Sequence, residues 1–289
     1  MNVDLDGPVH YVDFGGPRDA PRVVYVHGLG GSHINWNALA PLLQRHFRAV
    51  AVDLPGFGLT PAAGRKTSVA ANARVLRRFL RIIVKEPAML IGNSMGGFVS
   101  MTVAAGEPEL VDRLVLIDPT LPLARGVRVD PAVRKQFFLH GLPWVGERVL
   151  ARRYATVPAK QRVTEVLARC CLDPARVPAD MFEALVELET SLTEQRDHAA
   201  VHLAAARSIV YGLAWPKSYW RLMRAIDKPV LLLHGKHDRL ISVDSAREAA
   251  RRLPEWTYVE LEAGHIPMME VPELVAEQIV SWARLPRVP

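Results

Sequence analysis

The 289-residue sequence predicts an α/β fold in which a mostly parallel central sheet is flanked by helices and one all-helical segment is inserted. Two observations support this prediction. Short apolar runs that resemble buried strands alternate with segments of helical periodicity, which is typical of a parallel sheet covered on both faces. Between residues 119 and 228 the alternation stops, because helical patterns follow one another without a convincing strand. We therefore expect a core domain of residues 1–118 and 229–289, with residues 119–228 as a helical cap.

The first half of the core has strands and helices in alternation. The run over 10–14 alternates like an edge strand, whereas the later runs are continuous and end in loops rich in glycine or aspartate. The expected strands are 10–14, 22–26, 48–52, 88–91 and 114–117, and the expected helices are 36–47, 68–85 and 98–105.

Prolines in the inserted segment stand where helices could begin. Asp130 followed by Pro131 is typical of a helix cap with proline at the first helical position, and Pro143, Pro158 and Pro178 are placed similarly. We expect four to six helices here. The strand pattern then resumes over 229–233 and 256–261, with helices over 242–253 and 272–285.

Composition places the chain among globular proteins of the cytoplasm. Hydrophobic residues make up 49% of the sequence and charged residues 23%, which is enough to build a core. The N-terminus lacks the apolar run of a secretory signal, and no stretch approaches the roughly 18 apolar residues of a membrane span. Cys170 and Cys171 are the two cysteines, and their adjacency fits a reducing compartment.

The net charge of +6 lies entirely in the inserted segment, which holds 17 basic and 11 acidic residues. Residues 119–169 alone hold 10 basic and 3 acidic residues, beside the apolar stretch 137–145. Either these apolar residues cover a substrate pocket while the arginines are solvated, or this basic cap contacts an anionic membrane. We favour the first interpretation. No nucleic-acid partner is expected, since the arginines at 74, 77, 78 and 81 form one polar helix face, and no oligomeric state is predicted.

Ser94 lies at the centre of a Gly-x-Ser-x-Gly pattern between a predicted strand and a predicted helix. A strand that turns sharply into a helix holds the serine in a strained conformation with its hydroxyl exposed. Gly92 and Gly96 remove the Cβ atoms that would clash there. Polar residues also follow the other predicted strands, and ligands bind at that edge of a parallel sheet. The polar residues at strand ends are His27, Asp53, Ser94, Asp118, Asp238 and His265.

A serine nucleophile needs a base, and the base needs a partner that orients it. His265 and Asp238 supply these in the order Ser, Asp, His, and together with the elbow this pattern resembles the α/β-hydrolase fold family. The loop of residues 27–31, the loop of residues 53–58 and the sequence after Gly264 are similar to further motifs of that family. The resemblance implies that Ser94 is the nucleophile, His265 the general base and acid, and Asp238 the orienting carboxylate. It also implies an oxyanion hole made by the backbone N–H groups of Leu29 and Met95.

Other residues have competing interpretations. Asp118 also ends a predicted strand and is the alternative to Asp238, although we favour Asp238. His27 is expected to brace its loop through a backbone hydrogen bond, and Asp53 to be a turn residue. A serine at the elbow argues against epoxide hydrolases and haloalkane dehalogenases, which carry aspartate there. His198 and His202 are spaced i, i+4 without a carboxylate pattern, so neither a metal nor a cofactor is expected.

The resemblance implies a serine hydrolase of the esterase or monoacylglycerol-lipase type, acting through an acyl-enzyme on a small ester with an apolar acyl group. The alternatives are a carbon-carbon bond hydrolase of the meta-cleavage type, a thioesterase or a perhydrolase. The meta-cleavage subfamily has a similar elbow. However, this chain has Gly31-Ser32 where that subfamily has Pro-Gly, and Ile266 where it has tryptophan. A noncatalytic binding protein of the same fold is the alternative from a different class.

Overall fold

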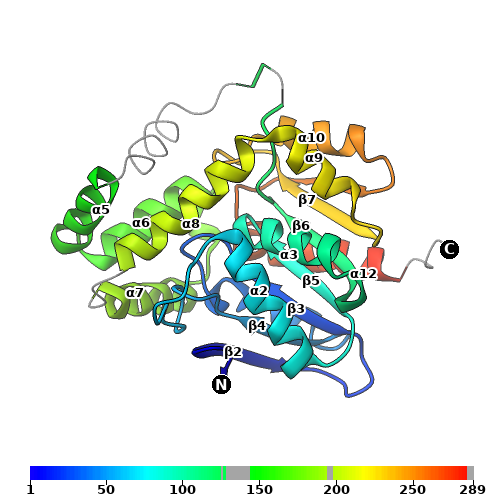
Figure 1. The fold of residues 1–289 in the computed structure, drawn as a ribbon, viewed down its shortest axis with the longest axis horizontal. Helices are drawn as coiled ribbons and strands as arrows, with labels where there is room; N and C mark the ends of the chain where they lie inside the picture. The colour runs from blue at the N-terminus through cyan, green and yellow to red at the C-terminus, as the bar shows by residue number, and fades with distance from the viewer. Residues whose placement is uncertain (125, 128–143, 194–197, 285–289) are drawn as a thin grey trace.

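The structure is a computed structural model that describes residues 1–124, 126–127, 144–193 and 198–284. Its centre is one sheet of eight strands (Figure 1). All seven predicted strands are present, and β1 is a further strand that the sequence pattern does not predict, because its three residues contain no apolar run. The strands are β1 (Asn2–Asp4), β2 (Pro8–Gly15), β3 (Arg22–Val26), β4 (Arg48–Val52), β5 (Ala88–Asn93), β6 (Val111–Ile117), β7 (Val230–Gly235) and β8 (Thr257–Leu261).

The strands are ordered β1-β2-β4-β3-β5-β6-β7-β8 across the sheet. β1 and β2 are antiparallel to their neighbours, and the other six strands are parallel. The register places Val26 beside Gly92, and Asn93 beside Ile117. The carboxyl ends of the parallel strands therefore lie along one edge, and the predicted polar residues follow them at that edge. The expected mostly parallel α/β sheet is confirmed.

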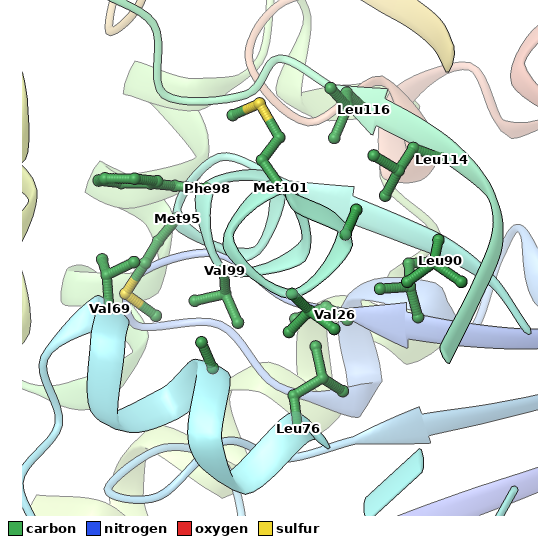
Figure 2. Close-up of a cluster of buried hydrophobic side chains, with 14 of the residues drawn as sticks. Val26, Val69, Leu76, Leu90, Met95, Phe98, Val99, Met101, Leu114 and Leu116 are labelled. Atoms are coloured by element: carbon green, nitrogen blue, oxygen red, sulfur yellow. The ribbon is translucent and has the colours of Figure 1, made fainter. Parts of the chain in front are cut away.

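The sheet separates two hydrophobic clusters because successive strand residues point to opposite faces. In β3, Val24 and Val26 belong to one cluster and Val23 and Tyr25 to the other. Figure 2 shows part of the first cluster, where residues of α3 pack between strand residues and α2. The labelled residues are Val26, Val69, Leu76, Leu90, Met95, Phe98, Val99, Met101, Leu114 and Leu116.

Helices cover both faces of the sheet. Residues of α2, α3, α9 and α10 belong to the first cluster, and residues of α1, α11 and α12 to the second. The α-helices are α1 (Ala40–Leu43), α2 (Val69–Phe79), α3 (Met95–Gly106), α5 (Val145–Thr156), α6 (Ala159–Cys170), α7 (Ala179–Thr193), α8 (His198–Leu213), α9 (Pro216–Arg224), α10 (Val243–Arg252), α11 (Pro267–Glu270) and α12 (Pro272–Ala283). Short helical turns are η1 (His33–Trp36), η2 (Leu80–Val84), η3 (Pro108–Leu110) and η4 (Pro174–Arg176).

The continuous helix predicted over residues 36–47 is wrong. The structure has η1, a turn, and then the single-turn helix α1. Pro41 explains the break, since proline has no N–H to donate and is tolerated only in the first turn of a helix. The other predicted core helices are present, and the helix predicted from Ser68 consists of α2 followed by η2.

The described part of the segment between β6 and β7 contains helices joined by irregular connections and no strand, and its first residues, 119–124, are not helical. It contains α5 to α9 and η4, and α5 to α8 lie together at the left of the view in Figure 1. Pro158 and Pro178 directly precede α6 and α7, as their positions in the sequence predict. Asp130, Pro131 and Pro143 lie outside the described residues. We call residues 119–228 the helical segment, and its role as a cap stays a prediction.

Candidate active site

Ser94 occupies the sharp turn between β5 and α3. Its backbone has φ 52° and ψ −116°, a strained conformation for a residue with a side chain. The neighbouring glycines make this turn possible. A Cβ on Gly92 would lie 2.6 Å from the carbonyl oxygen of Gly96, and a Cβ on Gly96 would lie 2.0 Å from the carbonyl oxygen of Val26. The strained elbow expected from the sequence is therefore present, with Ser94 half-buried.

His265 and Asp238 are joined by a hydrogen bond of 2.7 Å between Nδ1 of the imidazole and Oδ2 of the carboxylate. Both residues are buried, although they lie in the separate loops that follow β8 and β7. The backbone N–H of His265 also donates to the carbonyl oxygen of Cys170, at the end of α6, over 2.5 Å. The histidine is thus held by its ring and by its backbone.

The charge state of Asp238 follows from its neighbours. Burial by itself would raise the pKa of Asp238, but the interactions with His265 and His234 outweigh it and lower that pKa. Two backbone N–H groups, of Leu240 and Ile241, also donate to Oδ1 of Asp238 over 2.7 and 3.0 Å. Asp238 is therefore an ionised carboxylate at neutral pH, and it favours the His265 tautomer that carries a proton on Nδ1.

Asn93 connects the elbow to the histidine loop, and the sequence did not single it out for this role. Its side-chain amide nitrogen donates to the carbonyl oxygens of Ile117 and His265, each over 3.0 Å. The one available sequence signal was an amide at the last position of a buried strand. Among the described residues no hydrogen bond joins the hydroxyl of Ser94 to the ring of His265, so Asn93 makes the direct link between the two loops.

The loop after β3 packs against the elbow. A Cβ on Gly28 would lie 3.1 Å from Cβ of Ser94, which is tighter than most Cβ contacts, so the glycine relieves crowding at this approach. Met95 is the first residue of α3, where backbone N–H groups have no partner within the helix. Neither Leu29 nor Met95 has a backbone N–H that donates to another described residue. Both groups thus keep their donor capacity for a ligand.

His27 braces this loop, as expected from its position in the sequence. The backbone N–H of Leu54 donates to its Nε2 over 3.0 Å, and its Nδ1 lies 2.7 Å from the carbonyl oxygen of Gly28. Because Nε2 accepts, the ring proton is on Nδ1 and donates to Gly28. Burial lowers the pKa of His27, which keeps the ring neutral in this arrangement.

Asp53 is more than the turn residue that the sequence predicts. Its buried carboxylate accepts hydrogen bonds from Nδ1 of His10 over 3.0 Å and from Nδ1 of His33 over 2.8 Å. The backbone N–H groups of His33 and Leu59 also donate to it. Burial would raise the pKa of Asp53, but these donors hold it below its usual range. The sequence carries no local signal for His10 or His33, because neither stands next to Asp53 in the chain.

Helix α8 of the helical segment lies against these loops. The hydroxyl of Thr67 donates to the carbonyl oxygen of Val201 over 2.9 Å. A Cβ on Gly56 would lie 2.1 Å from Cγ1 of Val201, and one on Gly30 would lie 3.3 Å from Cε1 of His202. One turn of α8 therefore covers the loops that flank the elbow.

Two groups of side chains have the composition of metal ligands. They are His10, His33 and Asp53, and Asp118, His234 and Asp238, and the ligand atoms within each group lie within 4.8 Å of one another. In the first group Asp53 already accepts four hydrogen bonds, and in the second Asp238 accepts three. Hydrogen bonds thus account for both groups, and the absence of a metal cofactor stays a prediction.

The fold and the elbow define the class of this protein. Residues 21–272 match the family described as alpha/beta hydrolase fold, and the chain belongs to that family. It is a hydrolase, as its lipase and esterase relatives indicate. The resemblance inferred from the sequence is confirmed.

Particular relatives span most of the chain. The monoacylglycerol lipase ABHD6 of Rattus norvegicus is 25% identical over 289 residues, covering 95% of this chain and 80% of that protein. An uncharacterised protein of Mycobacterium tuberculosis (strain ATCC 25618 / H37Rv) is 33% identical over 261 residues, covering 87% of this chain and 72% of that protein. A thermophilic esterase from Thermogutta terrifontis shares the fold, with a TM-score of 0.74, 24% identity and 98% of each chain covered. Among the described residues, no helix is both long and apolar enough to cross a membrane.

Proposed function

We propose that this protein is a serine hydrolase that cleaves carboxylic esters with an apolar acyl group through an acyl-enzyme. The observation that carries the proposal is the buried hydrogen bond of 2.7 Å between His265 and Asp238, anchored through Asn93 beside the strained Ser94. A paired histidine next to a strained, half-buried serine is the arrangement that nucleophilic catalysis needs. The lipase relatives support an ester as the substrate.

The proposed reaction has two halves. Ser94 Oγ attacks the carbonyl carbon while Nε2 of His265 takes the hydroxyl proton, and the N–H groups of Leu29 and Met95 stabilise the oxyanion. His265 then returns the proton to the departing alcohol, which leaves an acyl ester on Ser94. Water attacks that ester with His265 again as the base, releasing the acid and restoring Ser94. Asp238 keeps the ring oriented throughout, and the Ser94–His265 hydrogen bond is expected to form with substrate bound.

The apolar acyl group is inferred from the side chains around the elbow. Phe57 and Phe98 are buried there, and Phe98 approaches Gly212 in α8. Phe57 lies 6.4 Å, between ring centroids, from His202. Such surroundings favour an acyl chain and disfavour a charged one.

A fluorophosphonate probe tests the mechanism. We expect the probe to label Ser94, with the adduct located by mass spectrometry, and the label to be absent from Ser94→Ala. Ser100→Ala is the matched control, because Ser100 is a buried serine of α3. An unlabelled Ser94, or a label that survives its replacement, overturns the mechanism.

Substrate turnover tests the ester assignment. We expect p-nitrophenyl esters to be hydrolysed, with kcat/KM rising as the acyl chain lengthens from acetate. A meta-cleavage dienoate should be cleaved slowly or not at all. Fast dienoate cleavage with negligible ester turnover would assign the protein to the carbon-carbon bond hydrolases instead.

Although the sequence pattern alone favours the pocket-covering role, the described surface of α5 leads us also to propose that the helical segment contacts an anionic membrane surface. The described part of the basic region supports this through one face of α5, where Val145 and Val149 are 45% and 44% exposed and alternate with the exposed Arg148 and Arg152. Trp144, directly before this helix, is 80% exposed. Apolar and cationic residues on one helix face are what an anionic interface attracts. Arg134, Lys135 and the largely apolar residues 137–143 of this region lie outside the described residues.

Co-sedimentation tests the membrane contact. We expect binding to phosphatidylcholine vesicles that contain phosphatidylglycerol, and weaker binding in high salt or after Arg148→Glu with Arg152→Glu. Arg251→Glu, on the exposed surface of α10, is the control. Binding that is indifferent to anionic lipid, salt and both substitutions overturns the contact. The cytoplasmic location stays a prediction, supported by two free cysteines.

A further inference from the structure

A second carboxyl group lies beside Asp238. Asp118 follows β6, as Asp238 follows β7, and both side chains are fully buried. The backbone N–H of Asp118 donates to the carbonyl oxygen of Leu233 over 2.9 Å, and its Oδ1 accepts from the N–H of Gly235 over 2.8 Å. Its φ of 44° is in the left-handed region, which aspartate and asparagine tolerate better than most residues. The neighbouring strand β7 thus holds Asp118 in one orientation.

The two carboxyl groups have unequal sets of donors. Asp238 accepts from Leu240, Ile241 and His265, so both of its oxygens are occupied. Asp118 accepts one hydrogen bond on Oδ1, while its Oδ2 is buried and has no donor among the described residues. An ionised oxygen in that position would be left without any compensating interaction, which is costly in a buried site.

His234 lies between the two carboxyl groups without neutralising them. Its Nε2 is 3.6 Å from Oδ1 of Asp118 and 3.6 Å from Oδ2 of Asp238. The same nitrogen lies 2.9 Å from the carbonyl oxygen of Ile241, to which it donates. Burial lowers the pKa of His234, so the ring is neutral. The other titratable groups that act on the pair are His265, Cys170, Tyr258 and Glu270.

Two adjacent buried carboxyl groups cannot both carry a charge at low cost, and one proton removes the conflict. Burial raises the pKa of Asp118 well above its usual range, and the charge of Asp238 raises it further. Asp238 has the larger set of donors and stays ionised. The proton then belongs on the oxygen of Asp118 that lacks a donor.

We propose that Asp118 is protonated at neutral pH and donates a hydrogen bond from Oδ2 to Asp238, as a positioning residue for the His265–Asp238 pair. Asp118 then accepts from Gly235 with one oxygen and donates with the other, so neither is left unsatisfied. The bond gives Asp238 a fourth donor and restrains its carboxylate against the ring of His265. The positioning role rests on the proposed function, whereas the proton itself does not.

Infrared spectroscopy tests the proton directly. We expect the difference spectrum of the native protein minus Asp118→Asn at pH 7 to contain the C=O stretch of a protonated carboxyl group, shifted in D2O. Asp227→Asn is the control, because Asp227 is an exposed carboxylate near β7 and its removal should affect only carboxylate bands. A carboxylate band in place of the acid band in the Asp118→Asn difference overturns the proposal.

Kinetics test the positioning role. Asp118→Ala removes both the donor and the acceptor, and we expect kcat to fall at least roughly tenfold. Asp118→Asn should retain most of the native kcat, since an amide donates through Nδ2, accepts through Oδ1 and tolerates the same φ. A kcat in Asp118→Asn as low as in Asp118→Ala, with both variants folded by thermal unfolding, overturns the role.

The pH profile separates a neutral Asp118 from a charged one. If Asp118 is neutral, the acid limb of the kcat/KM profile of Asp118→Asn lies at the same pH as in the native protein. If Asp118 is charged, the substitution removes a negative charge near His265 and moves that limb to lower pH, which overturns the proposal. If the acid band is present but the fluorophosphonate probe does not label Ser94, the protonation of Asp118 stands and the serine mechanism is rejected. Failure of the proposed function is therefore distinguishable from failure of the protonation proposal.

Discussion

The side-chain amide of Asn93 donates to the main-chain oxygen of His265 over 3.0 Å, although the two residues are 172 positions apart in the chain. The same nitrogen donates to the carbonyl oxygen of Ile117 in the neighbouring strand. The residue before Ser94 therefore holds the backbone of the histidine loop, and any displacement of that loop changes the distance from the imidazole to the serine.

Asn93→Ala should lower kcat more than it raises KM. It leaves the carbonyl oxygen of His265 without its donor and frees the histidine loop, whereas the carbonyl oxygen of Ile117 keeps the N–H of Ser94 at 3.1 Å. We therefore expect a roughly 10- to 100-fold loss in kcat and a loss of about 1–3 kcal/mol in unfolding free energy. Steady-state kinetics with a p-nitrophenyl ester and urea unfolding measure the two effects. Ser100→Ala is the control, because its buried hydroxyl has no partner among the described residues. A variant that loses stability but keeps kcat would contradict the positioning of His265 by Asn93.

Gly96→Ala should disrupt the packing of the elbow against β3. The new Cβ would lie 2.0 Å from the carbonyl oxygen of Val26, which is part of the sheet backbone and cannot move aside cheaply. We expect a loss of about 3 kcal/mol or more in unfolding free energy, measured by urea denaturation. Gly64→Ala isolates backbone strain, because that glycine has φ +76° but nothing within 4 Å of the added Cβ, and should cost about 1–2 kcal/mol. Equal losses in the two variants would rule out the clash as the cause.

Asp53→Asn should destabilise the protein at neutral pH and reduce its sensitivity to acid. The folded-state pKa of Asp53 is depressed by its hydrogen bonds from His10 and His33. Its contribution is therefore fully present above the unfolded pKa of about 3.9 and is lost as the pH falls through the folded value. We expect a loss of about 1–3 kcal/mol at pH 7, and a shallower decline in stability below about pH 4 than in the native protein. Urea unfolding at several pH values measures this, and parallel pH curves for the two proteins would contradict it.

Thr67→Val should loosen the contact between α8 and the core. The substitution keeps the shape of the side chain and removes the hydrogen bond of 2.9 Å to Val201. A loss of about 1 kcal/mol corresponds to roughly fivefold faster amide exchange where local opening limits it. Hydrogen-deuterium exchange of residues 198–213 measures the effect. Thr164→Val, which removes a hydrogen bond within α6, is the control, and equal exchange of α8 in both variants would show that this bond does not hold the helix.

Local patterns were sufficient for much of the fold and for Ser94. Apolar runs of four or five residues predicted the central parallel strands β3 to β7, because each of these strands buries both faces, and Gly92 and Gly96 predicted the elbow because only glycine fits there. The helix predicted over residues 36–47 was wrong because Pro41 interrupts a helix that hydrophobic spacing alone favours. β1 was missed because pairing with β2, rather than its own residues, makes it a strand.

Contacts between distant segments were decided by the tertiary structure. The sequence left Asp118 and Asp238 as alternatives for the partner of His265, because both follow strands of the same sheet. The order of β6, β7 and β8 settles the geometry, since it places Asp238 at 2.7 Å from the ring of His265 and turns Asp118 toward Gly235. The sequence by itself determined where the serine, the histidine and the two carboxyl groups stand, through local strand and turn patterns. Which carboxyl group meets the histidine depends on burial and strand order, and these exist only in the folded chain.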